Sequence, residues 1–139
     1  MTSRCLYLVM AIGLIGGCTA NRSSGNTSLS PDRWHAIEID GRPAVTVGAT
    51  QRPWIGFDVD SGRVSGFGGC NRFSGPYSMS GSSLKFGAMA MTRMACGDAV
   101  LNAQESAFAA ALHDTDNYVI SADTLTLLQA TTRRARLVR

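Results

Sequence analysis

The chain has 139 residues, of which 45% are hydrophobic and 7% aromatic, with 15 glycines and a formal net charge of +3. Low aromatic and high glycine content favour short strands and turns over long helices. No basic run is dense enough to indicate nucleic-acid binding, so we expect no nucleic-acid partner. The arginines of residues 133–139 are typical of a solvated edge strand protected by charge.

Residues 1–17 are predicted to be a bacterial lipoprotein signal peptide. Arg4 precedes an uncharged apolar run, residues 5–15, that is too short to span a bilayer. The run ends in Ile-Gly-Gly before Cys18, which resembles a lipobox and implies cleavage there and lipidation of the Cys18 thiol. The alternative is an ordinary secreted protein with a chance cysteine. Thr19, where retention rules would require Asp, favours the outer membrane, with the protein facing the periplasm.

Residues 18–31 are rich in Ser, Asn and Gly and show no apolar period, so they predict a lipidated cysteine followed by a flexible tether. The remainder, residues 32–139, is long enough for one small domain with a single core.

The first half of this domain is predicted to consist of strands. Alternating apolar residues and turn signals between them indicate strands over residues 34–39, 54–59, 63–66, 77–79 and 84–86. Asp60-Ser61-Gly62 is typical of a hairpin turn. Glycines at 66, 68 and 69 predict a tight bend, with Asn71 able to cap it.

The second half begins with the one predicted helix of the domain. Asp98 is a suitable N-cap, and an apolar face follows at helical spacing: Val100, Ala103 or Gln104, Ala107, Phe108, Ala111 and Leu112. Strands over residues 117–120, 125–128 and 135–138 close the chain. Strands, a helix and strands again predict an α+β, mainly β fold, in which an antiparallel sheet is curled around or closed by one helix.

Two segments resemble a known family. Val64-Ser65-Gly66, Gly69-Cys70-Asn71-Arg72-Phe73-Ser74-Gly75 and Tyr77 are similar to the central motif of the META domain, and Met91-Thr92-Arg93-Met94-Ala95-Cys96 to its second motif. The family includes HslJ-like heat-shock lipoproteins of the bacterial envelope. The resemblance implies a small, partly open β-barrel with one helix packed against it, and structural roles for Gly69, Asn71 and Gly75. Members are linked to stress responses and antibiotic tolerance, and the fold has been likened to secretion pilotins.

Cys70 and Cys96 are the cysteines left after signal cleavage and lipidation of Cys18. Export places them in an oxidising compartment, so a disulfide is the leading hypothesis. Two buried free thiols or a redox pair are the alternatives, although no Cys-x-x-Cys motif is present. A metal site built from both cysteines with His35 and His113 has no ligand spacing behind it, so we predict no metal and no other cofactor.

The Met-rich run offers a candidate binding surface, formed by Arg72, Met89 and Met91. Core packing is the ordinary role of such methionines, but two of them on one strand face can also line an apolar groove for a lipid tail or peptide. No Gly-x-Ser-x-Gly elbow or arrangement of Ser, His and Asp is present, so we predict no catalytic residues and no enzyme activity.

These features together predict a lipid-anchored periplasmic binding or scaffold module in envelope maintenance or stress tolerance. The membrane is its expected partner through Cys18, with an envelope protein or peptide as a further partner. The alternative is a pilotin-like chaperone that holds a peptide or an acyl chain in a barrel groove, and an envelope enzyme is the third possibility.

Overall fold

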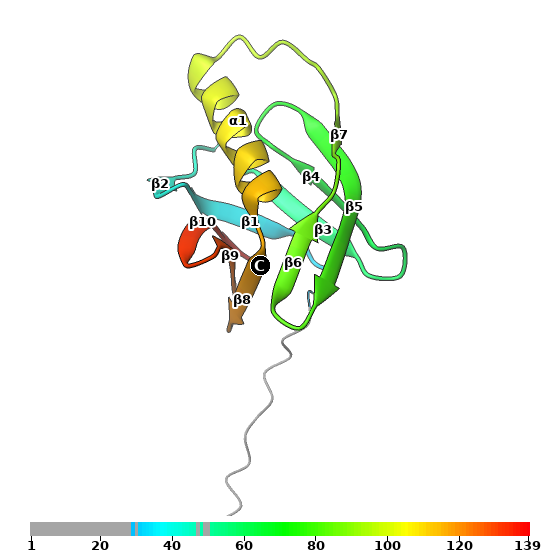
Figure 1. The fold of residues 1–139 in the computed structure, drawn as a ribbon. Coiled ribbons are helices and arrows are strands. Elements are labelled where there is room, and N and C mark those ends of the chain that lie inside the picture. Colours follow the sequence, from blue (N-terminus) through cyan, green and yellow to red (C-terminus); the bar gives the residue numbers. More distant parts are fainter. Residues whose placement is uncertain (1–28, 30, 47, 49–50) are drawn as a thin grey trace, which may run out of the picture.

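The fold is taken from a computed structural model that describes residues 29, 31–46, 48 and 51–139 (Figure 1). The predicted signal peptide, Cys18 and nearly all of the predicted tether lie outside the described residues. Leu29, inside that predicted tether, is 2% exposed and belongs to the hydrophobic core. Packing of the domain therefore starts before the predicted boundary at residue 32.

Eight antiparallel strands form a closed barrel, because pairing runs around the sheet and returns from the last strand to the first. In spatial order they are β1 (Trp34–Ile39), β3 (Trp54–Asp58), β4 (Arg63–Phe67), β5 (Arg72–Ser80), β6 (Ser83–Phe86), β8 (Asn117–Ser121), β9 (Thr124–Gln129) and β10 (Thr132–Val138). Two short strands, β2 (Arg42–Pro43) and β7 (Ala90–Met91), pair with β1 and β5. The predicted α+β, mainly β fold is confirmed.

The extent of strand pairing differs around the barrel. β9 and β10 pair over nearly their whole length, from Gln129 with Thr132 to Thr124 with Val138. β6 and β8 share a single register pair, Ser83 with Asn117. Two further backbone hydrogen bonds support this narrow join, from Leu84 N to Asp116 O and from Tyr118 N to Ser82 O.

One helix, α1 (Ala99–Asp114), lies across the barrel, between β7 on one side and β10 and β1 on the other (Figure 1). Its N-cap is Asp98, as predicted, and the side chain accepts hydrogen bonds from the amides of Val100 and Leu101. The buried side of α1 consists of Glu105, Phe108, Ala111 and Leu112. The predicted apolar face is wrong at Val100, which is 58% exposed because it lies in the first turn.

Two other expectations from the sequence differ from the structure. β10 is no edge strand, since it pairs with both β9 and β1, and its arginines are ion-paired with acidic side chains of neighbouring elements. β5 begins at Arg72, well before the strand predicted at 77–79, so the glycine-rich corner is confined to residues 68–71. Gly75 therefore lies inside a strand.

Candidate functional site

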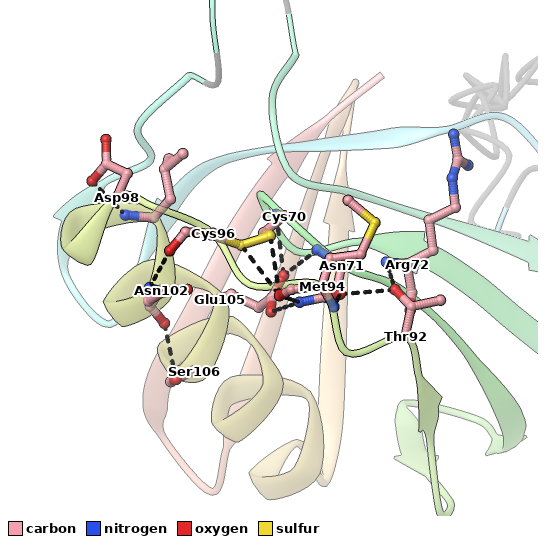
Figure 2. Close-up of a disulfide and its surroundings, with 11 residues drawn as sticks. Cys70, Asn71, Arg72, Thr92, Met94, Cys96, Asp98, Asn102, Glu105 and Ser106 are labelled. Atoms are coloured by element: carbon pink, nitrogen blue, oxygen red, sulfur yellow. Dashed lines mark hydrogen bonds between the residues drawn. A yellow bond between two sulfur atoms is a disulfide. The ribbon is translucent and has the colours of Figure 1, made fainter.

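A network of hydrogen bonds centred on Asn71 ties together three segments that are far apart in the sequence (Figure 2). Its side-chain oxygen accepts from the amide of Met94 at 2.7 Å and from the hydroxyl of Thr92 at 2.9 Å. Its side-chain nitrogen donates to Glu105 Oε1 at 2.7 Å and to the carbonyl of Met94 at 3.3 Å. Every polar atom of this buried amide group therefore has a partner.

Glu105 of α1 is the second member of the network and is only 8% exposed. Its Oε2 accepts hydrogen bonds from the backbone amides of Cys70 and Asn71, and its Oε1 accepts from the Asn71 side chain. Both carboxylate oxygens thus face donors of the corner. A buried carboxylate is stable only with such compensation, so Glu105 and the corner depend on each other.

The backbone of the corner fits this carboxylate because of its glycines. A Cβ atom on Gly68 would lie 2.8 Å from Cγ of Glu105, so only glycine allows the helix this close. Gly69 has φ 131°, a conformation that residues with a side chain rarely adopt. The structure thus gives the predicted structural residues Gly69 and Asn71 a common purpose, which is to present two amides to Glu105.

A disulfide between Cys70 and Cys96 joins the corner to the segment that leads into α1, with the two Cα atoms 6.0 Å apart. Asn102 of α1 donates to the carbonyl of Cys96 at 3.0 Å and holds the same segment from the helix side. We call Cys70, Asn71, Thr92, Cys96 and Glu105 the braced corner. It fixes α1 against the barrel.

An apolar groove of about 620 Å³ opens beside the braced corner, between the C-terminal half of α1 and the β6–β7 segment. Its walls are Phe73, Phe86, Gly87, Ala88, Met89, Met91, Ala109 and Leu112, with His113 at one side. Gly75 makes the wall possible, because a Cβ there would lie 2.6 Å from the sulfur of Met89 and 2.8 Å from the carbonyl oxygen of Ala88.

The three residues of the predicted binding surface, Arg72, Met89 and Met91, do not all line the same hollow. Met89 and Met91 line the groove, but Arg72 does not. Arg72 points away from the braced corner (Figure 2) and lines a second hollow of about 420 Å³ together with Trp54 and Met91. Met91 is the one residue of the three that belongs to both.

The strand edge that faces α1 has backbone groups without a partner strand. The amide of Gly87 donates to the carbonyl of Pro76, and the amide of Thr92 donates to the carbonyl of Arg72. These two are therefore hydrogen-bonded pairs of the ladders that β6 and β7 form with β5. In an antiparallel ladder the intervening residues, Phe86 and Met91, then direct their N–H and C=O groups away from β5. Within the described residues no strand pairs with that outer edge, since β8 meets β6 only at Ser83.

The two histidines lie apart from each other. His113 Nδ1 is 3.0 Å from Asp114 Oδ1, and the other oxygen of Asp114 accepts from Arg134 at 3.0 Å. The pKa of His35, on β1, is lowered from its usual value, first by burial and then by the charges of Arg33 and Arg52. Among the described residues no three His, Cys, Asp or Glu side chains gather as a metal site would require.

The roles of two members of the braced corner were not predicted from the sequence. Glu105 was hidden because a single acid in an Ala-rich helix is typical of a solvated face, and Thr92 appeared only as part of a motif. One signal was available for Glu105. It lies seven residues after the N-cap Asp98, on the same side of the helix as Phe108 and Leu112.

The fold and the braced corner define a class of protein, the small closed antiparallel β-barrels crossed by one disulfide-anchored helix. No helix of the described residues is long and apolar enough to cross a membrane. The chain belongs to the META domain family, whose model matches residues 27–139. None of the curated proteins matches the chain.

Solved structures of similar proteins agree with this assignment. An NMR structure of a protein from Burkholderia xenovorans has 26% sequence identity and a TM-score of 0.63, covering 80% of this chain and 83% of that one. A second NMR structure has 30% identity and a TM-score of 0.62, covering 79% and 91%. A crystal structure of a DUF4847 family protein from Bacteroides vulgatus, with 14% identity and a TM-score of 0.53 over 79% and 93%, shares the fold.

Proposed function

We propose that the protein is a lipid-anchored binding module of the bacterial cell envelope that takes an extended apolar segment of a partner into its groove. The observation that carries the proposal is the groove itself, whose side walls are the aromatic and thioether side chains of Phe73, Phe86, Met89 and Met91. Binding grooves for extended peptides combine such apolar walls with a strand edge that accepts main-chain hydrogen bonds.

The outward backbone groups of Phe86 and Met91 favour a peptide over an acyl chain. A peptide segment carries its own N–H and C=O groups and can pair with this edge, whereas an acyl chain leaves the edge unsatisfied. The braced corner supports the same function, because it fixes α1 and so keeps the groove formed before the partner arrives.

The anchor is part of the proposal. Cys18 carries the lipid, the protein is held on the outer membrane facing the periplasm, and the groove serves envelope maintenance under stress. Acyl chains contribute about 0.8 kcal/mol per buried methylene, so a multiply acylated cysteine gives stable attachment. Mass spectrometry of the mature N-terminus tests this directly. An unmodified Cys18, or a first residue other than Cys18, would refute the anchor.

We place the protein among binding modules and not among enzymes. The groove walls carry no hydroxyl or thiol nucleophile, and His113 is their one titratable side chain. His113 is engaged with Asp114, which is in turn bound by Arg134, an arrangement that a surface ion-pair chain explains.

The groove is tested by NMR titration of the protein with an extended peptide of alternating apolar and polar residues, and separately with dodecanoate. We expect the peptide to shift the amide resonances of Phe86 and Met91 in wild type. Ala109→Glu places a charge at the half-buried wall of the groove and is expected to abolish the shifts, whereas Val119→Glu, at a 52% exposed position of β8, leaves them unchanged. Shifts with dodecanoate alone would overturn the peptide proposal in favour of an acyl-chain carrier.

A further inference from the structure

The arginines of the domain fall into two groups. Four of them, at the end of the chain, are paired with carboxylates: Arg133, Arg134, Arg136 and Arg139. The other six described arginines form no ion pair with any carboxylate of the described residues and are exposed: Arg33, Arg42, Arg52, Arg63, Arg72 and Arg93. Positive charge is therefore neutralised on β10 and left uncompensated elsewhere.

Three of the unpaired arginines, Arg33, Arg52 and Arg72, gather around one half-buried aromatic residue, Trp54. The guanidinium carbon of Arg33 is 4.3 Å from the centroid of the Trp54 ring. Arg72 and Trp54 line the same hollow, and their strands are linked through Phe67, which pairs with both residues. Arg52 precedes Trp54 by two residues, and its charge reaches His35, the β1 partner of Trp54. We call Arg33, Arg52, Trp54 and Arg72 the Trp54 face.

The Trp54 face lies where the chain outside the structure joins the domain. Leu29 is the first described residue and is buried in the core, and Arg33 follows four residues later. Ten residues lie between Cys18 and Leu29. As a flexible coil such a segment spans roughly 18 Å on average, and about 40 Å at full extension. A lipid on Cys18 would hold this side of the domain within reach of the membrane surface.

We propose that the Trp54 face docks on the anionic headgroups of the membrane that carries the lipid anchor. The inference rests on the anchor proposed above and adds an orientation to it. Guanidinium groups bind phosphate oxygens in pairs of hydrogen bonds, and Trp settles at the boundary between headgroups and acyl chains. Asp32, next to Arg33 in sequence, contributes one negative charge here, and the three arginines of the face outnumber it. The net charge of this side is therefore positive.

The orientation has a consequence for the groove. Met91 lines both the hollow of the Trp54 face and the apolar groove, so the two share a wall. A domain docked through the Trp54 face therefore holds one end of its groove close to the headgroups. It would meet partner segments as they emerge at, or lie along, the membrane surface.

Arginine footprinting tests the proposal on the whole lipidated protein. The mature protein is placed in nanodiscs of phosphatidylcholine alone, or of phosphatidylcholine with 30% phosphatidylglycerol, treated with phenylglyoxal and read by mass spectrometry. We expect Arg33, Arg52 and Arg72 to react about fivefold more slowly in the anionic discs, the factor that one arginine gains near an anionic leaflet. Arg63 is the internal control: it is also exposed and lies at the opposite end of β4, where its neighbours in the strand register are Asp58 of β3 and Pro76 of β5.

Salt and substitutions sharpen the result. Protection that depends on charge should be lost at 1 M salt, where the Debye length is about 3 Å. Arg52→Glu combined with Arg72→Glu should remove the protection of Arg33, whereas Arg63→Glu combined with Arg42→Glu should not. Equal reactivity of the three arginines in both kinds of disc, with the protein still bound to them, overturns the docking and leaves the anchor standing. A protein that does not co-elute with the discs refutes the anchor instead.

Discussion

The two sides of the barrel near α1 are held in opposite ways. At the braced corner a disulfide and a buried carboxylate with three donors join β5, the Met-rich segment and α1. At the β6–β8 join the barrel closes through one register pair and a few backbone hydrogen bonds. The groove lies between them. A binding site built next to a fixed support and a weak seam can keep its shape and still widen for a ligand.

The largest effect is expected from Glu105→Ala, which removes the acceptor of two backbone amides and of the Asn71 side chain. Buried donors without an acceptor cost about 1–3 kcal/mol each, so the free energy of unfolding should fall by about 4 kcal/mol. Urea denaturation followed by circular dichroism measures it. Ser106→Ala, the next residue of α1, is the matched control, with an expected change within about 0.5 kcal/mol. Equal losses in both variants would show that the carboxylate does not hold the corner.

The disulfide is the second largest contribution. Replacing Cys70 and Cys96 by serine opens a loop of 26 residues and should lower the free energy of unfolding by about 3.5 kcal/mol in the chain-entropy model. The fold should persist, since the Asn71 and Glu105 network remains. A double-mutant cycle with Glu105→Ala tests whether the two braces cooperate. Strictly additive losses would mean that they act as independent supports.

Hydrogen exchange compares the corner with the weak join without any substitution. The amides of Leu84 and Tyr118 form the bonds across the join, and they should exchange at least about tenfold faster than the amide of Leu127, which lies within the sheet, in β9. Local opening at the join requires few bonds to break, whereas β9 is paired on both sides. Uniform protection around the barrel would refute the idea of a weak seam beside the groove.

The sequence predicts features that depend on neighbouring residues, but not contacts between residues that are far apart in the chain. Hairpins such as β3–β4 and the Asp98 cap depend on neighbouring residues, and they were predicted from turn and capping residues. The META motif indicated the importance of Asn71 and Gly75 but not their partners. Glu105 lies 34 residues from Asn71, and no local pattern relates the two. The same holds for β10, whose pairing with β1 joins the two ends of the domain.

The smallest expected effect concerns His35, which lies on β1 and outside both regions of the comparison. Burial and the charges of Arg33 and Arg52 lower its pKa in the folded protein below the usual 6.5. Between the folded pKa and about 6.5 the unfolded chain binds more protons, so stability falls as the pH drops through this window. The loss should stay under about 1 kcal/mol, because His35 is only partly buried and solvent still screens its charge.

Arg52→Gln separates the causes of this shift. Removing one positive charge should raise the pKa of His35 and reduce the loss of stability on acidification, while the burial contribution remains. An NMR titration of the His35 ring protons measures the pKa, and thermal unfolding at pH 5 and pH 7 measures the stability. The same charge acts in the Trp54 face, so an unchanged His35 pKa in this variant would place Arg52 too far from β1 to belong to that face. A raised pKa would place the guanidinium of Arg52 near His35, the strand partner of Trp54, as membership of the Trp54 face requires.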